Sequence, residues 1–137
     1  MAAFWTPLGN IRLNSRYFNP ANSSRNPELL ALLYHEVIHL EQGPLVALSV
    51  RGELEAWQRQ FLLLKKLGRA PGHRAILELL ALPLNWDRSV LRRARELMQE
   101  YAGKGYLAHL LPLYPIPREV RYWIGSLPGL TNHSKEE

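Results

Sequence analysis

The sequence predicts an α+β fold that is mainly helical, with a short N-terminal β-hairpin followed by several helices. The first residues combine a turn sequence with alternating apolar and polar positions, a pattern typical of paired strands. The later segments carry apolar residues at steps of three and four between capping and stop signals, which indicates amphipathic helices. Residues 35–39 also spell H-E-x-x-H, a motif whose chemistry requires a helix.

The predicted hairpin, which would form a small sheet against the motif helix, occupies residues 4–18. Residues 8–10 form a turn sequence, and residues 11–14 then alternate between apolar and polar side chains. Pro7 suggests an exposed edge, because proline cannot donate a backbone hydrogen bond. Residues 19–25 are polar and turn-forming, so we expect them to form the loop that leads into the motif helix.

The predicted motif helix begins after Asn26, whose side chain can cap free backbone amides, and Pro27 suits its first position. Gly43 and Pro44 should end this helix. Between these signals, apolar residues at helical spacing provide a stripe that can pack on a core. The stripe is formed by Leu30, Leu33, Val37 and Leu40.

A second predicted helix follows Pro44 and runs to Leu67, with Gly52 as its weakest helix former. Its apolar stripe is formed by Val50, Leu54, Trp57, Phe61 and Leu64. Capping and stop residues predict further helices at residues 73–82, 87–102 and 117–124.

The 137 residues are expected to form one domain over residues 1–130, followed by a flexible C-terminal tail at residues 131–137. Hydrophobic residues make up 47% of the chain, which is enough for a core. Because cysteine is absent, disulfides, thiolate metal sites and cysteine nucleophiles are excluded, and a reducing compartment is expected. We find no signal peptide and no long apolar segment, and so expect a cytoplasmic protein without membrane contact.

The chain is basic, with a net charge of +5, and most of its 17 basic residues are arginine. A basic chain raises the question of a nucleic-acid partner. The arginines within residues 87–102 are spread around the predicted helix, which favours a solvated face over a binding patch. Nucleic acid is therefore an unfavoured partner.

The motif at residues 35–39 predicts a zinc site. On a helix, His35 and His39 project from one face one turn apart, so both imidazoles can bind the same ion. Zinc prefers four ligands, which leaves room for a third protein ligand and a water molecule. Glu36 would lie beside that water, where it can take a proton from it and pass the proton to a leaving amine.

The third ligand should lie downstream of His39. Glu41 is unsuitable, because two positions along a helix turn its side chain away from the metal. Glu53 borders the apolar stripe of the next helix, and the small Ala56 one turn on would allow close helix packing, so Glu53 is favoured. Glu55 is the alternative. Without the motif, both glutamates would be interpreted as solvent-facing partners of nearby arginines.

The motif with a glutamate on the following helix resembles the gluzincin type of zincin metallopeptidase, and the chain is similar to the smallest domains of that kind. The resemblance covers about residues 10–67. It implies a zincin-like fold in which the extended segment 11–18 belongs to the sheet that lines the active-site cleft. It also implies that Zn2+ is bound by His35, His39 and Glu53, with Glu36 as the catalytic base.

The sequence thus predicts a zinc-dependent metallopeptidase that acts on a peptide or protein substrate. Such an enzyme also needs a donor that stabilises the oxyanion, and the sequence does not choose among His73, Tyr101, Tyr106 and His109. Two alternatives stay open. A zincin-like module could bind metal or peptide without hydrolysis, and a basic helical domain could bind nucleic acid while carrying the motif by chance.

Overall fold

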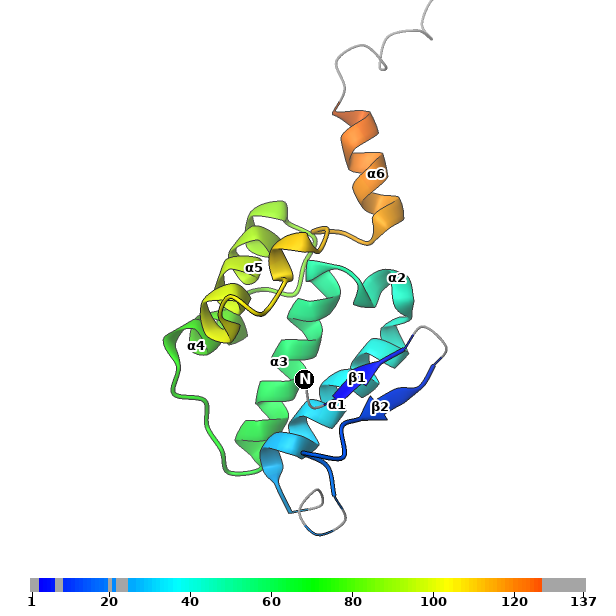
Figure 1. Cartoon of the computed structure of the whole chain (residues 1–137). Helices are drawn as coiled ribbons and strands as arrows, with labels where there is room; N and C mark the ends of the chain where they lie inside the picture. Colours follow the sequence, from blue (N-terminus) through cyan, green and yellow to red (C-terminus); the bar gives the residue numbers. More distant parts are fainter. Residues whose placement is uncertain (1–2, 7–8, 20, 22–24, 127–137) are drawn as a thin grey trace, which may run out of the picture.

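The computed structural model describes residues 3–6, 9–19, 21 and 25–126 (Figure 1). It is mainly helical, so the predicted coarse fold class is confirmed. The expected tail at residues 131–137 lies outside the described residues. In chain order the elements are β1 (Ala3–Trp5), β2 (Ile11–Leu13), α1 (Pro27–Gln42), α2 (Pro44–Ala47), α3 (Val50–Lys66), α4 (Arg74–Ala81), α5 (Arg88–Ala102), the 3-10 helix η1 (Ala108–Leu110) and α6 (Ile116–Gly125).

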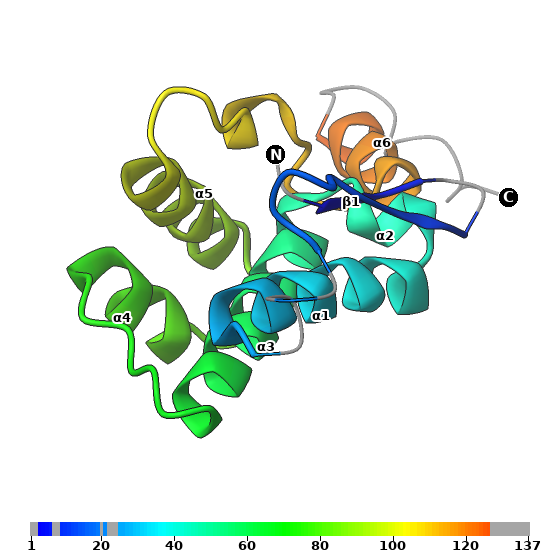
Figure 2. The same ribbon diagram turned by 60° about the horizontal axis from the view of Figure 1, so that its bottom comes forward.

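β1 and β2 form a two-stranded antiparallel sheet in which Phe4 pairs with Arg12. The backbone amide of Thr6 donates to the carbonyl of Asn10 at 2.7 Å and closes the hairpin. β1 packs against α1, and Figures 1 and 2 show the hairpin next to this helix. The hairpin therefore flanks the helix that carries the motif.

α1 begins and ends where the sequence predicts. The Asn26 side chain accepts hydrogen bonds from the first backbone amides, and Gly43 ends the helix with a φ of +73°, a value that favours glycine. The predicted apolar stripe is only half-buried. The face toward α3 is instead the most buried part of α1, and it carries Ala31, His35, Ile38 and His39. The motif therefore lies between two packed helices.

The helix predicted from Pro44 to Leu67 is interrupted, so that prediction is wrong. The break falls at Ser49, which is fully buried and caps α3. The Ser49 hydroxyl donates to the Val46 carbonyl at 2.7 Å and accepts from the Gly52 amide at 3.1 Å. A serine at this position stabilises a new helix start within a run of helix-forming residues. Gly52 lies inside α3, where a Cβ would overlap the carbonyl of Val46.

The hydrophobic core lies between α3, α4, α5 and η1. The apolar stripe predicted for α3 is confirmed, because its members belong to this core or pack at its edge. Ala56 is also fully buried on α3 but lies outside the core, so α3 is covered on more than one side. The largest contributors from the other elements are Ile76, Leu79, Leu91, Leu97, Met98, Leu113 and Tyr114.

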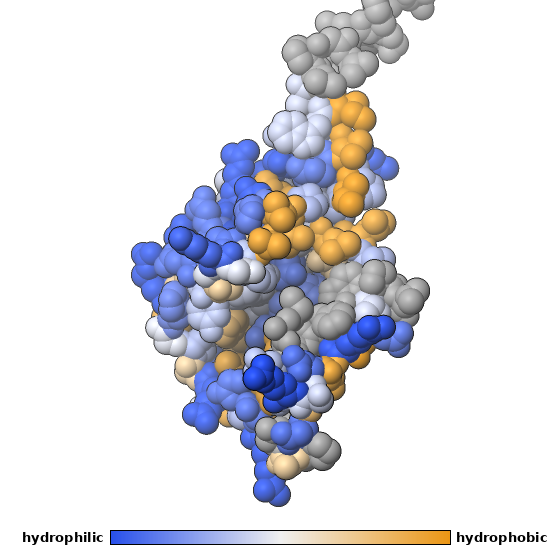
Figure 3. Space-filling model, viewed as in Figure 1, coloured by the Kyte–Doolittle hydropathy of each residue, from blue (hydrophilic) through white to orange (hydrophobic). Residues whose placement is uncertain are grey.

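α6 is joined to the rest of the molecule through Arg88. The Arg88 guanidinium donates to both carboxylate oxygens of Glu119, at 2.9 and 3.0 Å, and lies 4.0 Å from the ring centroid of Tyr122. The prediction that the arginines of residues 87–102 lie on a solvated face is therefore wrong for Arg88, whose side chain is only 14% exposed. α6 has no buried residue, and Figure 3 shows apolar side chains along it; they include Ile116, Val120 and Ile124.

Candidate metal centre

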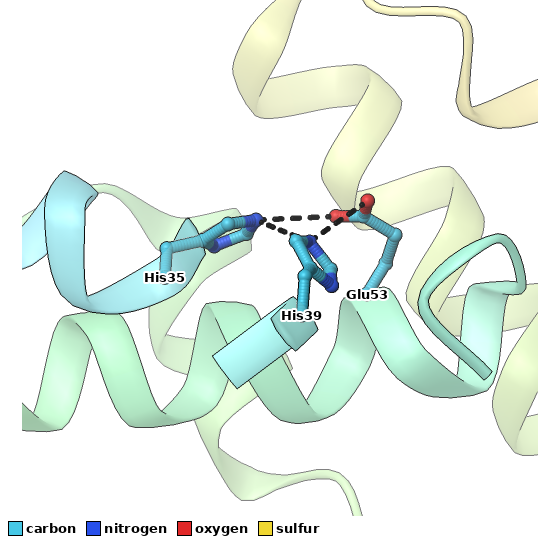
Figure 4. A group of neighbouring side chains, drawn as sticks. All are labelled: His35, His39 and Glu53. Atoms are coloured by element: carbon cyan, nitrogen blue, oxygen red, sulfur yellow. Dashed lines mark hydrogen bonds and ion pairs between the residues drawn. The ribbon is translucent and has the colours of Figure 1, made fainter. Parts of the chain in front are cut away.

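Two helices bring the motif histidines and a downstream glutamate together. His35 and His39 are four residues apart on α1, so they share one face. Glu53 lies in the first turn of α3, where the Ser49 cap fixes the backbone and the helix dipole favours a carboxylate. Figure 4 shows the two imidazoles and the carboxylate pointing at one another between the helices.

One ligand atom from each of His35, His39 and Glu53 forms a compact triangle, in which all three atoms lie within 4.8 Å of one another. His35 Nε2 and His39 Nε2 are 2.9 Å apart. Glu53 Oε2 lies 3.6 Å from His35 Nε2, and Glu53 Oε1 lies 3.4 Å from His39 Nε2. A tetrahedral zinc shell with bonds of about 2.1 Å separates its ligand atoms by about 3.4 Å. Within the described part of the chain, these residues are the group of metal-ligating side chains that could hold an ion. The three side chains are therefore close enough to hold one metal ion together.

The three side chains are shielded from solvent. The side chains of His35, His39 and Glu53 are 9%, 2% and 14% exposed. A carboxylate buried beside imidazole nitrogens needs a neighbouring positive charge, which either protons on the histidines or a metal cation can provide. The donor set of two nitrogens and one carboxylate is also the set found in catalytic zinc sites, with one coordination position left over.

The electrostatics of the site follow from this arrangement. Burial alone would raise the pKa of Glu53, but the adjacent imidazoles of His35 and His39 hold it well below its ordinary value. Burial alone would lower the pKa of His39, but the Glu53 carboxylate raises it above its ordinary value. The triangle therefore favours a negative Glu53 that faces positive charge.

Glu36 lies close to the triangle. It follows His35 on α1 and is 7% exposed. Its negative charge contributes to the raised pKa of His39, and it contributes in the same way to the raised pKa of Tyr106, behind burial and the charge of Glu53. Glu36 therefore favours the protonated forms of His39 and Tyr106.

The structure shows contacts around the site that the sequence analysis did not predict. The Tyr106 hydroxyl donates to Glu53 Oε2 at 2.7 Å, and the Trp57 indole donates to the same oxygen at 3.1 Å. On the histidine side, His39 Nδ1 lies 3.1 Å from Gln42 Oε1. Trp57 and Gln42 lie four and three residues after their partners, so helical spacing could have indicated them. Tyr106 was one of the four candidates for stabilising the oxyanion. No sequence pattern predicted that its hydroxyl would contact Glu53.

The remaining candidate residues lie apart from the triangle. Glu55 receives hydrogen bonds from Arg51 at 3.2 Å and Gln42 at 3.3 Å, and it is not a member of the metal-ligating group. His73 caps α4 and its ring contacts Tyr101 at a centroid distance of 5.1 Å. The structure therefore brings Glu53, the favoured third ligand, to the histidines and places Glu55 outside the triangle.

We compared the chain with protein-family models, curated proteins and solved structures, and none of them matches it. None of the described helices has the length and apolar character needed to cross a membrane.

Proposed function

We propose that the chain is a zinc-dependent peptidase in which His35, His39 and Glu53 hold one zinc ion. The observation that carries this proposal is the convergence of two imidazole nitrogens and one carboxylate, with one ligand atom from each residue within 4.8 Å of the others. The distances of 2.9 Å between the nitrogens and 3.4 Å from His39 Nε2 to Glu53 Oε1 are near the separation of about 3.4 Å between ligands in a tetrahedral zinc shell. Three protein ligands leave one position for water or substrate, which distinguishes a catalytic zinc site from a closed structural one.

A bound zinc ion would polarise the scissile carbonyl and lower the pKa of a water molecule. Glu36 is the general base in this proposal, because it is a buried carboxylate beside a ligand and its charge acts on His39. Its carboxylate accepts a proton from the attacking water and donates that proton to the leaving amine. One water is consumed, the peptide bond breaks, and Glu36 returns to its ionised form.

A second candidate is a zincin-like module that binds metal without hydrolysis. The burial of the triangle favours it, because the His39 side chain is only 2% exposed and a peptide must reach the ion before it can be cut. The Tyr106 hydroxyl also donates to Glu53, so this oxyanion candidate already has an acceptor within the site.

The replacement Glu36→Gln separates the two candidates. We expect the variant to bind one zinc ion as the wild type does, because Glu36 is not a ligand in this proposal. Cleavage of a mixed peptide library, measured by mass spectrometry, should fall by about 10²–10⁴-fold, the usual contribution of a general base. His39→Ala, which removes a ligand, serves as the control that should lose both zinc and cleavage.

Each outcome decides between the candidates. Zinc-dependent cleavage that disappears in Glu36→Gln supports the peptidase. Full cleavage by Glu36→Gln would contradict the role of Glu36. Zinc binding by the wild type with no cleavage of any library peptide would instead support the non-hydrolytic module.

A further inference from the structure

We propose that Gln42 is a positioning residue that fixes the tautomer of His39, with the Nε2 lone pair directed at the metal position. The inference rests on the metal centre of the proposed function, and it assigns a role to a residue that is itself not a ligand. Gln42 is the last residue of α1 and lies three residues beyond His39, on the side of the ring opposite the triangle.

The orientation of the Gln42 amide is set by its neighbours. Its Nε2 donates to the Gly52 carbonyl at 3.0 Å and to Glu55 Oε2 at 3.3 Å, and both of these partners can only accept hydrogen bonds. If the amide were turned over, its oxygen would face two other oxygens without a proton between them. The amide oxygen must therefore face His39.

This orientation determines where His39 carries its proton. Gln42 Oε1 lies 3.1 Å from His39 Nδ1 and can only accept, so Nδ1 must be the protonated nitrogen. In the neutral ring Nε2 then has the lone pair, and it lies 2.9 Å from His35 Nε2 and 3.4 Å from Glu53 Oε1. A histidine ligand needs this arrangement, because the nitrogen that binds the metal cannot keep its proton.

Gln42 also couples the two helices that supply the ligands. Its amide bonds the Gly52 carbonyl in the first turn of α3, immediately before Glu53. Its other partner, Glu55, is held by Arg51 at 3.2 Å. The same side chain therefore orients one ligand and ties α1 to the turn that carries another.

The variant Gln42→Met tests this role, since methionine has a similar shape and offers neither the acceptor nor the two donors. We expect zinc affinity, measured by competition with a chromophoric chelator, to fall by about 10–100-fold, as is usual when the outer partner of a histidine ligand is lost. Gln58→Met is the matched control. Gln58 donates two comparable bonds to the carbonyls of Leu79 and Leu82, away from the triangle, so its loss should leave zinc affinity unchanged.

A second measurement uses metal-free protein and does not depend on activity. Long-range ¹H–¹⁵N correlation spectra of histidine, recorded in alkaline buffer where the rings are neutral, show which nitrogen of His39 carries the proton. We expect Nδ1 in the wild type and a shift toward Nε2 in Gln42→Met, because an Nε2 proton could then be donated to Glu53.

The two measurements separate this inference from the proposed function. A proton on Nε2 of His39 in the wild type would overturn the role of Gln42, as would unchanged zinc affinity in Gln42→Met. A proton on Nδ1 with weakened zinc binding in the variant supports it, whether or not any peptide is cleaved. Failure of the peptidase assay alone therefore contradicts the hydrolytic function and leaves the role of Gln42 supported.

Discussion

The three potential ligands differ in how firmly their orientation is held. Glu53 Oε2 accepts hydrogen bonds from Tyr106 at 2.7 Å and Trp57 at 3.1 Å, which leaves Oε1 toward His39 at 3.4 Å. His35 Nδ1 is buried and has no hydrogen-bond partner among the described residues, so its ring is the least constrained. Orientation by outer partners raises the affinity of a metal ligand, because less freedom is lost on binding.

Glu53 and Glu55, two residues apart on α3, should contribute unequally to zinc binding. Glu53→Ala should weaken zinc binding by more than the 10–100-fold typical of an outer partner, because it removes a ligand. Glu55→Ala is the matched control and should change the affinity by at most about tenfold, since Glu55 reaches His39 only through Gln42. Zinc titration of both variants measures the difference. Equal losses, or a larger loss in Glu55→Ala, would reassign the third ligand.

The sequence could indicate the triangle because each of its members obeys helical spacing. The motif fixed the two histidines on one face, and the position of Glu53 beside an apolar stripe directed it toward the packed side of its helix. The contact of Tyr106 with Glu53 joins residues 53 positions apart, in a segment with no periodic pattern, so no local rule could predict it. Tertiary packing alone decides such a contact.

At the scale of the elements, the site depends on how closely α3 approaches α1 and α2. Gly52 makes the close approach to α2 possible, because its backbone lies against the carbonyl of Val46 with no space for a Cβ. Ser49 fixes the same region through its two hydrogen bonds and begins α3 just ahead of Glu53. The first turn of α3 therefore sets the position of the third ligand.

Gly52→Ala should destabilise the fold even though alanine is the better helix former. The added Cβ would overlap the Val46 carbonyl, and displacement of backbone in a packed region costs about 1–3 kcal/mol of unfolding free energy. Chemical denaturation measures this loss. Gly125→Ala is the control, because Gly125 is also helical but has no atom near its added Cβ, so its stability should stay the same or rise slightly. A Gly52→Ala protein as stable as the wild type would contradict this account of the helix packing.

Element boundaries with clear caps were predictable, whereas the break before α3 was not. Asn26 and Asp87 each accept backbone hydrogen bonds at the start of their helices, as the sequence indicates. Ser49 acts in the same way, but it lies within a run of apolar residues that by itself favours a continuous helix. The half-buried stripe of α1 has a similar cause: the polar motif face, and not the most apolar one, packs on α3.

At the scale of the whole molecule, α3 connects two parts. On one side it packs against α1 and contributes a ligand, and on the other it contributes to the core with α4 and α5. Several arginines join elements through carboxylates. Arg93 bonds Glu78 between α5 and α4 at 2.6 and 2.8 Å, and Arg88 bonds Glu119 between α5 and α6. These ion pairs give the high arginine content a structural role.

The central claim is that His35, His39 and Glu53 bind one zinc ion. The most direct test is elemental analysis of the folded protein, purified without added metal or a nickel-binding tag and then titrated with zinc. We expect one tightly bound zinc ion per chain in the wild type, and no stoichiometric zinc in His35→Ala or His39→Ala variants that keep their helical circular dichroism. A folded wild-type protein that contains no metal and does not bind added zinc would contradict the account.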